Sequence, residues 1–185
     1  MSRHRKSRVP LLVGVTLALV RSIAVLGDEA VAGTLPKDAC ALLTPAEVQA
    51  ALAPAVSIGS GISAGSMLPL GVGCTYTWGP RTKEWGDSAL TITVIDISTA
   101  YPGTRPDTIK EGLLAKAKVG GPDASEIGGV GDAGAFTFEA RVSSATVEAY
   151  YKGKDLDLSL TFHGAESLHA KEKLVDLLKK AGARL

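Results

Sequence analysis

The first candidate for chemistry in this chain is a serine in a short glycine pattern. Gly61-Ile62-Ser63-Ala64-Gly65 matches G-x-S-x-G, which presents a nucleophilic serine on a strand-to-helix turn in α/β-hydrolases. His163 or His169, with aspartates between, would complete the order Ser, Asp, His. That fold needs a core strand before the serine and many βα units, and neither is indicated around Ser63. We therefore predict no catalytic residues. A small serine hydrolase that uses Ser63 and His163 is kept as the alternative function.

A second match, Gly129 to Gly134, has the G-x-G-x-x-G spacing of dinucleotide-binding loops. In those loops the glycines follow a strand and open a helix, whose N-terminus binds the pyrophosphate. Here the motif follows a loop and leads into a strand predicted for residues 135–140. The sequence therefore predicts a turn whose glycines allow positive φ, and no nucleotide cofactor.

Histidine and cysteine are too sparse for a metal site. His163 and His169 are the only histidines after His4, whereas zinc takes three or four ligands at defined spacing. We expect both to be exposed polar side chains, and we predict neither a metal nor any other cofactor. Asp155 and Asp157 would share one face of a predicted strand, where a solvated surface explains them better than paired acid–base chemistry.

One aromatic side chain is the candidate for ligand contact. Tyr76, Trp78, Trp85 and Tyr101 cluster around the first predicted hairpin. Core packing is the better explanation for Tyr76 and Trp78, which share one face of a strand. Trp85 falls in or near the turn, where a large ring could stack on a sugar or a peptide. We therefore predict a ligand-binding role for Trp85.

The N-terminus has the layout of an export signal. The basic run from Arg3 to Arg8 precedes an apolar stretch over residues 9–20, and Ala-Val-Ala at 30–32 has the pattern that a signal peptidase cleaves. The apolar stretch is shorter than the ~20 residues that span a bilayer. We predict a signal peptide over 1–32 and a single exported domain over 33–185. An uncleaved anchor is the alternative, because a second apolar piece follows Arg21.

Two cysteines, Cys40 and Cys74, are the only ones in the chain, and both lie after this segment. An oxidising compartment would join them, so we predict a Cys40–Cys74 disulfide and a secreted or periplasmic location. Signal cleavage would remove five of the 20 basic and two of the 19 acidic residues, leaving a net charge of −2. Because no basic stripe remains, we expect no nucleic-acid partner. We also expect no membrane span after cleavage, and a monomer.

The elements that would position these residues can be read from capping and periodicity. Thr44-Pro45-Ala46-Glu47 forms a capping box with proline at the first helical position, so a helix should begin there and end before Pro54. Further helices are predicted over 107–119 and 167–181, and a long loop over 57–73. Strands are predicted over 74–78, 90–97, 135–140, 146–151 and 156–162.

The alternation of residues 90–97 shifts by one at Ile95, which indicates a bulge or a strand buried on both faces. The short turns predict antiparallel pairing. The chain should therefore be an α+β domain of two layers, a mainly antiparallel sheet of about five strands with helices packed on one face, and one disulfide.

Three blocks of the sequence resemble a known family. They run from Asp38 to Val48, from Cys74 to Trp78, and from Ile127 to Gly134. They are similar to the bacterial secreted and lipoprotein domains of unknown function of the DUF3558 group. The resemblance implies an exported, disulfide-linked α+β domain, often tethered at the cell envelope, and supplies no catalytic residues. This chain departs from it in lacking a cysteine suited to lipid attachment.

Export, a disulfide and a compact sheet are indicated, whereas no set of residues matches an enzyme in spacing and context. We therefore expect a non-enzymatic domain of the bacterial cell envelope that binds an envelope ligand or protein.

Overall fold

The protein is described by a computed structural model that covers residues 34–54, 58–59, 61–68, 70–79 and 88–185. The predicted signal peptide and its cleavage site lie outside these residues. Trp85, the predicted ligand-binding residue, also lies outside them.

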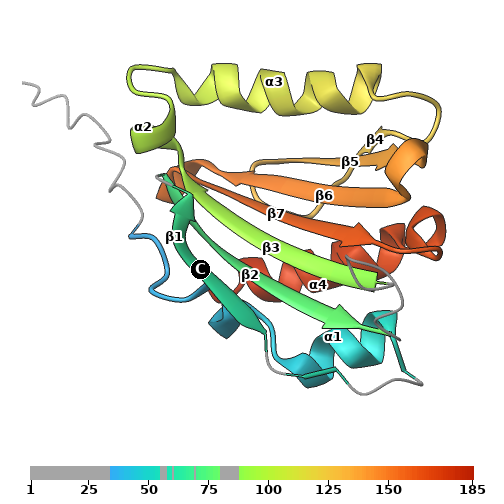
Figure 1. Cartoon of the computed structure of the whole chain (residues 1–185). Helices are drawn as coiled ribbons and strands as arrows, with labels where there is room; N and C mark the ends of the chain where they lie inside the picture. Colours follow the sequence, from blue (N-terminus) through green and yellow to red (C-terminus); the bar gives the residue numbers. More distant parts are fainter. Residues whose placement is uncertain (1–33, 55–57, 60, 69, 80–87) are drawn as a thin grey trace, which may run out of the picture.

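A seven-stranded antiparallel sheet forms the middle of the molecule, in the order β1-β2-β3-β7-β6-β5-β4 (Figure 1). Its strands are β1 (Ile62–Leu68), β2 (Gly71–Trp78), β3 (Ser88–Asp96), β4 (Ser125–Glu126), β5 (Ala133–Glu139), β6 (Ser144–Tyr151) and β7 (Leu156–His163). The expectation of about five strands is wrong, because β1 lies inside the predicted loop 57–73 and β4 has only two residues. β1 lacks the usual alternation, and its pairing with β2 contains register shifts.

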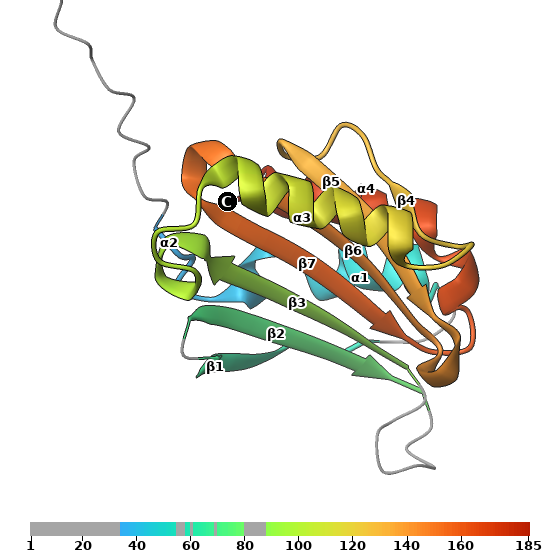
Figure 2. The same cartoon turned by 90° about the horizontal axis from the view of Figure 1, so that it is seen from above.

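Helices cover both faces of the sheet. They are α1 (Pro45–Leu52), α2 (Ile97–Ala100), α3 (Pro106–Val119) and α4 (Lys171–Gly182). α1 and α4 lie against one face and α3 lies across the other (Figures 1 and 2). The predicted two-layer arrangement with helices on one face is therefore wrong. The class, an α+β domain with a mainly antiparallel sheet and one disulfide, is confirmed.

The main core follows from the period-2 alternation of the central strands. In β7, Leu156, Leu158, Leu160 and Phe162 are buried, and they point to the same side as the buried apolar residues of β3 and β6. α4 packs Leu174, Leu177, Leu178 and Ala181 against this face. The intervening residues of β7 must therefore point to the opposite face.

A smaller core lies under α3. Leu113 and Ala117 of this helix pack with Ala133, Ala135 and Tyr150 from β5 and β6. Away from this cluster, the same face carries threonines that hydrogen-bond in pairs across strands. Thr146 and Thr161 lie 3.0 Å apart between their hydroxyl oxygens, and Thr75 and Thr91 lie 3.2 Å apart.

Of the two explanations offered for the shifted alternation at the end of β3, the bulge is wrong, whereas apolar residues on both faces agree with Ile95, which lines the pocket on the α3 side. The register with β2 runs without interruption from Ser88 to Ile95. The strand then ends because Asp96 caps α2, accepting hydrogen bonds from the hydroxyls of Ser98 at 2.6 Å and Thr99 at 2.9 Å. Ile95 therefore faces the α3 side, and Ile97 belongs to the short helix.

The N-terminal part is clamped to the sheet as the sequence predicts. Cys40 and Cys74 form a disulfide with their Cα atoms 5.1 Å apart. Thr44 and Glu47 make the capping box that starts α1. The buried Tyr76 hydroxyl lies within hydrogen-bond distance of the carbonyl oxygens of Leu43 and Cys40, which both precede α1. Covalent and hydrogen bonds thus fix the start of α1 against β2.

The C-terminus closes over the same helix. Arg184 donates to both carboxylate oxygens of Glu47, at 2.8 and 2.7 Å, and to the carbonyl of Leu42 at 2.8 Å. The hydrogen bond from Arg184, helped by the Thr44 backbone, lowers the pKa of Glu47 to about 2. The capping glutamate therefore also joins α4 to α1.

Replacing both Cys40 and Cys74 by alanine should lower the free energy of unfolding by about 3–4 kcal/mol, because the disulfide closes a 34-residue separation and restricts the unfolded chain. In a domain of this size that corresponds to roughly 10 °C in Tm. Thermal and urea unfolding of the full chain measure it. Dithiothreitol should destabilise the wild type and leave the double variant unchanged; equal sensitivity of the two would contradict the prediction.

The ion pair predicts a loss of stability in acid. Since the pKa of Glu47 is about 2 in the folded chain against an ordinary 4.5, its stabilising effect is complete above pH 4.5 and is lost as the pH falls towards 2. Glu47→Gln should be less stable at pH 7 by about 1 kcal/mol, and the difference should vanish near pH 2. Glu172→Gln, an exposed change on α4, is the control, and its stability should follow the wild type throughout.

Candidate functional site

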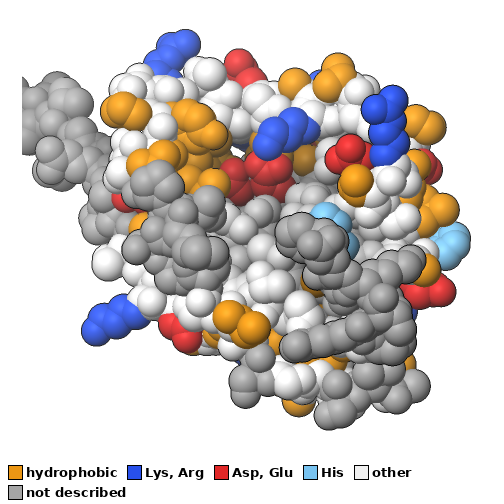
Figure 3. All heavy atoms as spheres, viewed as in Figure 1, with side chains coloured by type: hydrophobic (Ala, Val, Ile, Leu, Met, Phe, Trp, Pro, Cys, Tyr) orange, Lys and Arg blue, Asp and Glu red, His pale blue; other side chains and the backbone are white. Residues whose placement is uncertain are grey.

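A pocket of about 320 Å³ opens between α3 and the neighbouring face of the sheet. Its lining comes from β3, α2 and the residue after it, α3, β6 and β7. In the view of Figure 3, acidic side chains lie in a hollow of the surface, with hydrophobic side chains on one side and a basic one on the other. The lining residues with chemical function are Tyr101, Thr108, Lys116, Glu148 and Asp157.

Two carboxyl groups reach the pocket because of strand alternation. Asp157 is the second residue of β7, between buried Leu156 and Leu158, so it points away from the main core. Glu148 lies between Val147 and Ala149 of β6 for the same reason. The register pairs Asp157 with Tyr150 and Glu148 with Ser159, which places the two carboxyls diagonally across adjacent strands.

The helix supplies the opposite side of the pocket. Ile109, Leu113 and Lys116 recur at helical spacing on the side of α3 that faces the sheet. Gly112 also lines the pocket, and a Cβ atom built on it would meet no atom within 4 Å. The helix therefore leaves open space beside Lys116.

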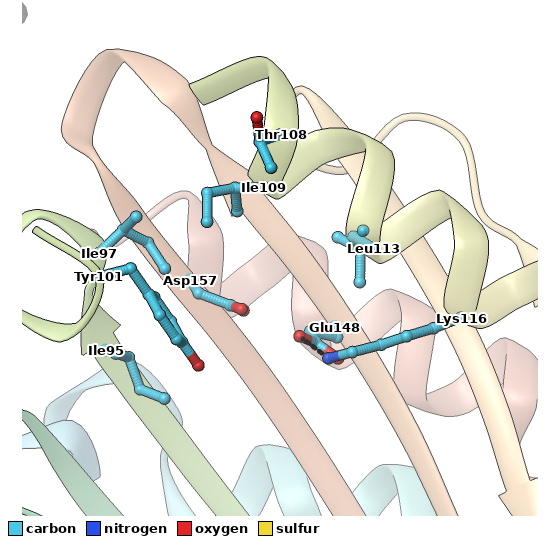
Figure 4. Close-up of a pocket in the computed structure, with 10 residues that line it drawn as sticks. Ile95, Ile97, Tyr101, Thr108, Ile109, Leu113, Lys116, Glu148 and Asp157 are labelled. Carbon is cyan, nitrogen blue, oxygen red and sulfur yellow. Dashed lines mark hydrogen bonds and ion pairs between the residues drawn. The ribbon is translucent and has the colours of Figure 1, made fainter. Parts of the chain in front are cut away.

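Lys116 and Glu148 form an ion pair at the mouth of the pocket. The Lys116 Nζ lies 2.7 and 2.9 Å from the two carboxylate oxygens of Glu148 (Figure 4). Burial alone would lower the pKa of Lys116, but the hydrogen bond and charge of Glu148 outweigh it and raise the pKa. Both oxygens of Glu148 thus accept from one ammonium group.

Asp157 is not paired with a cation in this way, and the hydrogen bond that favours its protonated form is the one to Glu148. Its Oδ1 atom is buried and accepts no hydrogen bond within the described part of the chain. Burial, followed by the negative charge and hydrogen bonding of Glu148, raises the pKa of Asp157 to about 8, and the opposing effect of Lys116 is smaller. At pH 7 this carboxyl is therefore mainly protonated and neutral.

The remaining wall is apolar. Ile95, Ile97 and Tyr101 lie together on the side of the pocket opposite Lys116, with Ile109 and Leu113 above (Figure 4). Tyr101 is 53 % exposed, so part of its ring is open to a bound molecule. The site thus combines an apolar wall with a carboxyl group whose Oδ1 atom has no hydrogen-bond partner among the described residues. This arrangement suits a molecule with an apolar part and a hydrogen-bond donor.

The structure does not bring Ser63 and His163 together. Ser63 lies in β1, opposite Cys74, and through β2 and β3 it is aligned with Leu160 of β7. Three strand spacings of about 4.8 Å separate β1 from β7, and His163 lies on the opposite face from Leu160. No Ser–His pair can therefore form between these residues in this structure.

The two histidines do not meet in a metal-binding cluster. His163 ends β7 and His169 lies in the 3-10 helix Ser167–His169, and both are exposed, as the sequence predicts. Among the residues that the structure describes, no group of three or more His, Cys, Asp or Glu could hold a metal ion.

The interpretation of Asp155 and Asp157 as one solvated face is wrong. Asp155 lies in the turn before β7, with φ at 51°, and accepts a hydrogen bond from Tyr150 at 3.2 Å. Asp157 is largely buried beside Glu148. A signal for the site was present in the sequence, because Lys116 continues the inward stripe of Ile109 and Leu113. A lysine on such a stripe needs a buried or partly buried partner.

The glycine motif forms the turn that the sequence predicts. Gly129 and Gly131 have φ of 73° and 50°, and the chain then enters β5. A Cβ at Gly131 would come within 2.4 Å of the Tyr150 carbonyl oxygen. Glycine is therefore required there for the close approach to β6, and no helix N-terminus follows the motif.

The raised pKa of Asp157 predicts a pH-dependent stability. Because the folded chain holds this proton up to about pH 8, whereas an unfolded aspartate releases it near 3.8, stability contributed by the group falls as the pH rises from about 4 to 8. Asp157→Asn should therefore be more stable than the wild type at pH 8 by at least about 1 kcal/mol and nearly equal at pH 4. Urea unfolding at both pH values tests this, with the exposed Asp176→Asn as control; an unchanged difference between the two pH values would count against the prediction.

Comparison of the chain with family models, curated proteins and solved structures found no match. No helix among the described residues is long and apolar enough to cross a membrane. The resemblance to the DUF3558 group therefore stays a prediction from the sequence.

Proposed function

We propose that this chain is a non-enzymatic, exported binding module of the bacterial cell envelope that holds a small amphipathic molecule in the pocket between α3 and the sheet. The observation that carries the proposal is a cavity of about 320 Å³ with an apolar wall and a buried carboxyl oxygen that has no hydrogen-bond partner among the described residues. Buried polar atoms normally have a hydrogen-bond partner. A ligand that donates to Asp157 would supply the missing one.

The pocket lining supports binding rather than catalysis. Among the described residues that line it, none is a serine, a cysteine or a histidine. Lys116 is held by Glu148 as an ion pair, which keeps it charged and unsuited to nucleophilic attack. The alternative hydrolase gains no support from the positions of Ser63 and His163, which lie three strands apart.

The exported location is supported by two features. The Cys40–Cys74 disulfide indicates an oxidising environment, outside the reducing cytoplasm. The basic and apolar segments at the N-terminus have the order of a signal peptide. The resemblance to envelope domains of unknown function agrees with both.

Filling the pocket tests the proposal. Thr108, Gly112 and Lys116 form one i, i+4 row on the pocket side of α3, so Gly112→Phe would place a ring in the space that a ligand needs. A thermal-shift screen of small amphipathic compounds against the full chain should give ligands that raise the Tm of the wild type. Those shifts should be lost in Gly112→Phe.

The matched control is Ala115→Phe, which adds a ring at an exposed position of α3 that does not line the pocket. This variant should keep the Tm shifts of the wild type. Equal shifts in Gly112→Phe, or the absence of any stabilising compound, would contradict a binding function for the pocket.

A further inference from the structure

The pocket residues also indicate the chemical class of the ligand, an inference that rests on the proposed function. We infer that the pocket binds an organic ammonium ion, whose charged nitrogen lies between Asp157 and Glu148 and whose apolar body packs on Ile95, Ile97 and Tyr101. The argument has three parts: the balance of charge, the unpartnered acceptor, and the size and polarity of the wall.

The balance of charge favours a cation. Among the described lining residues, two carboxyl groups from adjacent strands share the pocket with a single cationic side chain, Lys116. That lysine donates to both oxygens of Glu148, at 2.7 and 2.9 Å. Once Asp157 is ionised, the site carries one uncompensated negative charge. An anionic ligand would have to break the Lys116–Glu148 pair and also face Asp157.

The unpartnered acceptor calls for an N–H donor. Asp157 Oδ1 is buried and receives no hydrogen bond within the described residues. A hydroxyl could donate to this atom, but it would not offset the charge of an ionised carboxylate. An ammonium group does both, and charge-assisted hydrogen bonds of this kind are about twice as strong as neutral ones.

Binding then replaces a proton by the ammonium ion. Asp157, protonated at pH 7, releases its proton to the buffer as the ligand nitrogen, already carrying its own protons, takes the vacated position. The titratable groups around Asp157 are Glu148 and Tyr150 on β6, Lys116 on α3, and Tyr101 after α2; the pocket residue of β3 is the apolar Ile95. Tyr150 is fixed by its hydrogen bond to Asp155. The raised pKa of Asp157 therefore places a change of charge in this pocket near pH 8.

The wall limits the size of the body. A cavity of about 320 Å³ is at the small end of the range of about 300–1,000 Å³ for ligand pockets, which fits a short alkyl chain or a single ring. Ile95, Ile97 and the exposed ring of Tyr101 provide the apolar contact on the side away from Lys116 (Figure 4).

Three probes of the same length separate the possibilities. We would titrate n-hexylamine, n-hexanol and hexanoate into the full chain by isothermal titration calorimetry at pH 6.5 and 8.5. Hexylammonium should bind at least roughly tenfold more tightly than hexanol, and hexanoate should not bind. Since only ionised Asp157 accepts the ammonium, the affinity for hexylammonium should rise roughly 20-fold from pH 6.5 to pH 8.5. Titrations at pH 7 in buffers of different ionisation enthalpy should show release of close to one proton.

Matched variants assign these effects to the site. Asp157→Asn should abolish the pH dependence and the preference for hexylammonium over hexanol, while Asp176→Asn should retain both. Hexanol or hexanoate binding as tightly as hexylammonium, or more tightly, would overturn the ammonium assignment. Binding of none of the three probes, when the screen has found another pocket ligand, would also overturn it. In both cases the pocket would still be a binding site. Hexylammonium binding that persists in Gly112→Phe would instead place the site elsewhere and overturn both proposals.

Discussion

The alternation of β7 is the constraint on which the rest of the structure depends. β7 is the central strand of the sheet, and four of its residues, Leu156, Leu158, Leu160 and Phe162, enter the main core. A strand that buries every second side chain must send the others to the opposite face. Asp157 is one of these others. The carboxyl in the pocket is thus held in place by the strand that also anchors the core, which gives it little freedom to move away from Glu148.

The two sides of the sheet have different roles. On the α1 and α4 side, the disulfide, the Tyr76 hydroxyl and the Glu47–Arg184 pair hold the start of α1 and the residues after α4 against a continuous apolar core. On the α3 side, the apolar cluster is small, and a cavity lies beside it. The α3 side can tolerate a buried carboxyl oxygen that has no hydrogen-bond partner among the described residues, because the larger core on the other side stabilises the domain. Such local costs are typical of binding sites.

The elements with strong local signals could be predicted closely. The capping box places the start of α1, the alternation from Leu156 to Phe162 gives β7, and the cysteine pair gives the disulfide. β1 could not be predicted, because its one glycine and two serines interrupt any strand pattern and its pairing depends on the edge that β2 offers. The side of the sheet taken by α3 was equally hidden, since an amphipathic helix shows which of its faces is buried but not which face of the sheet receives it.

For the candidate site too, some features follow from local sequence signals and others depend on tertiary contacts. By itself the sequence determined that Asp157 points away from the core and that Cys40 and Cys74 are the only possible disulfide pair. These conclusions depend on local periodicity and residue count alone. Only the tertiary structure decided that Asp157, Glu148 and Lys116 meet, since they come from three elements whose proximity depends on strand order and on the path of α3 across the sheet. The same long-range packing buries the Asp157 oxygen and raises its pKa, turning an aspartate that the sequence places on a solvated face into the centre of the pocket.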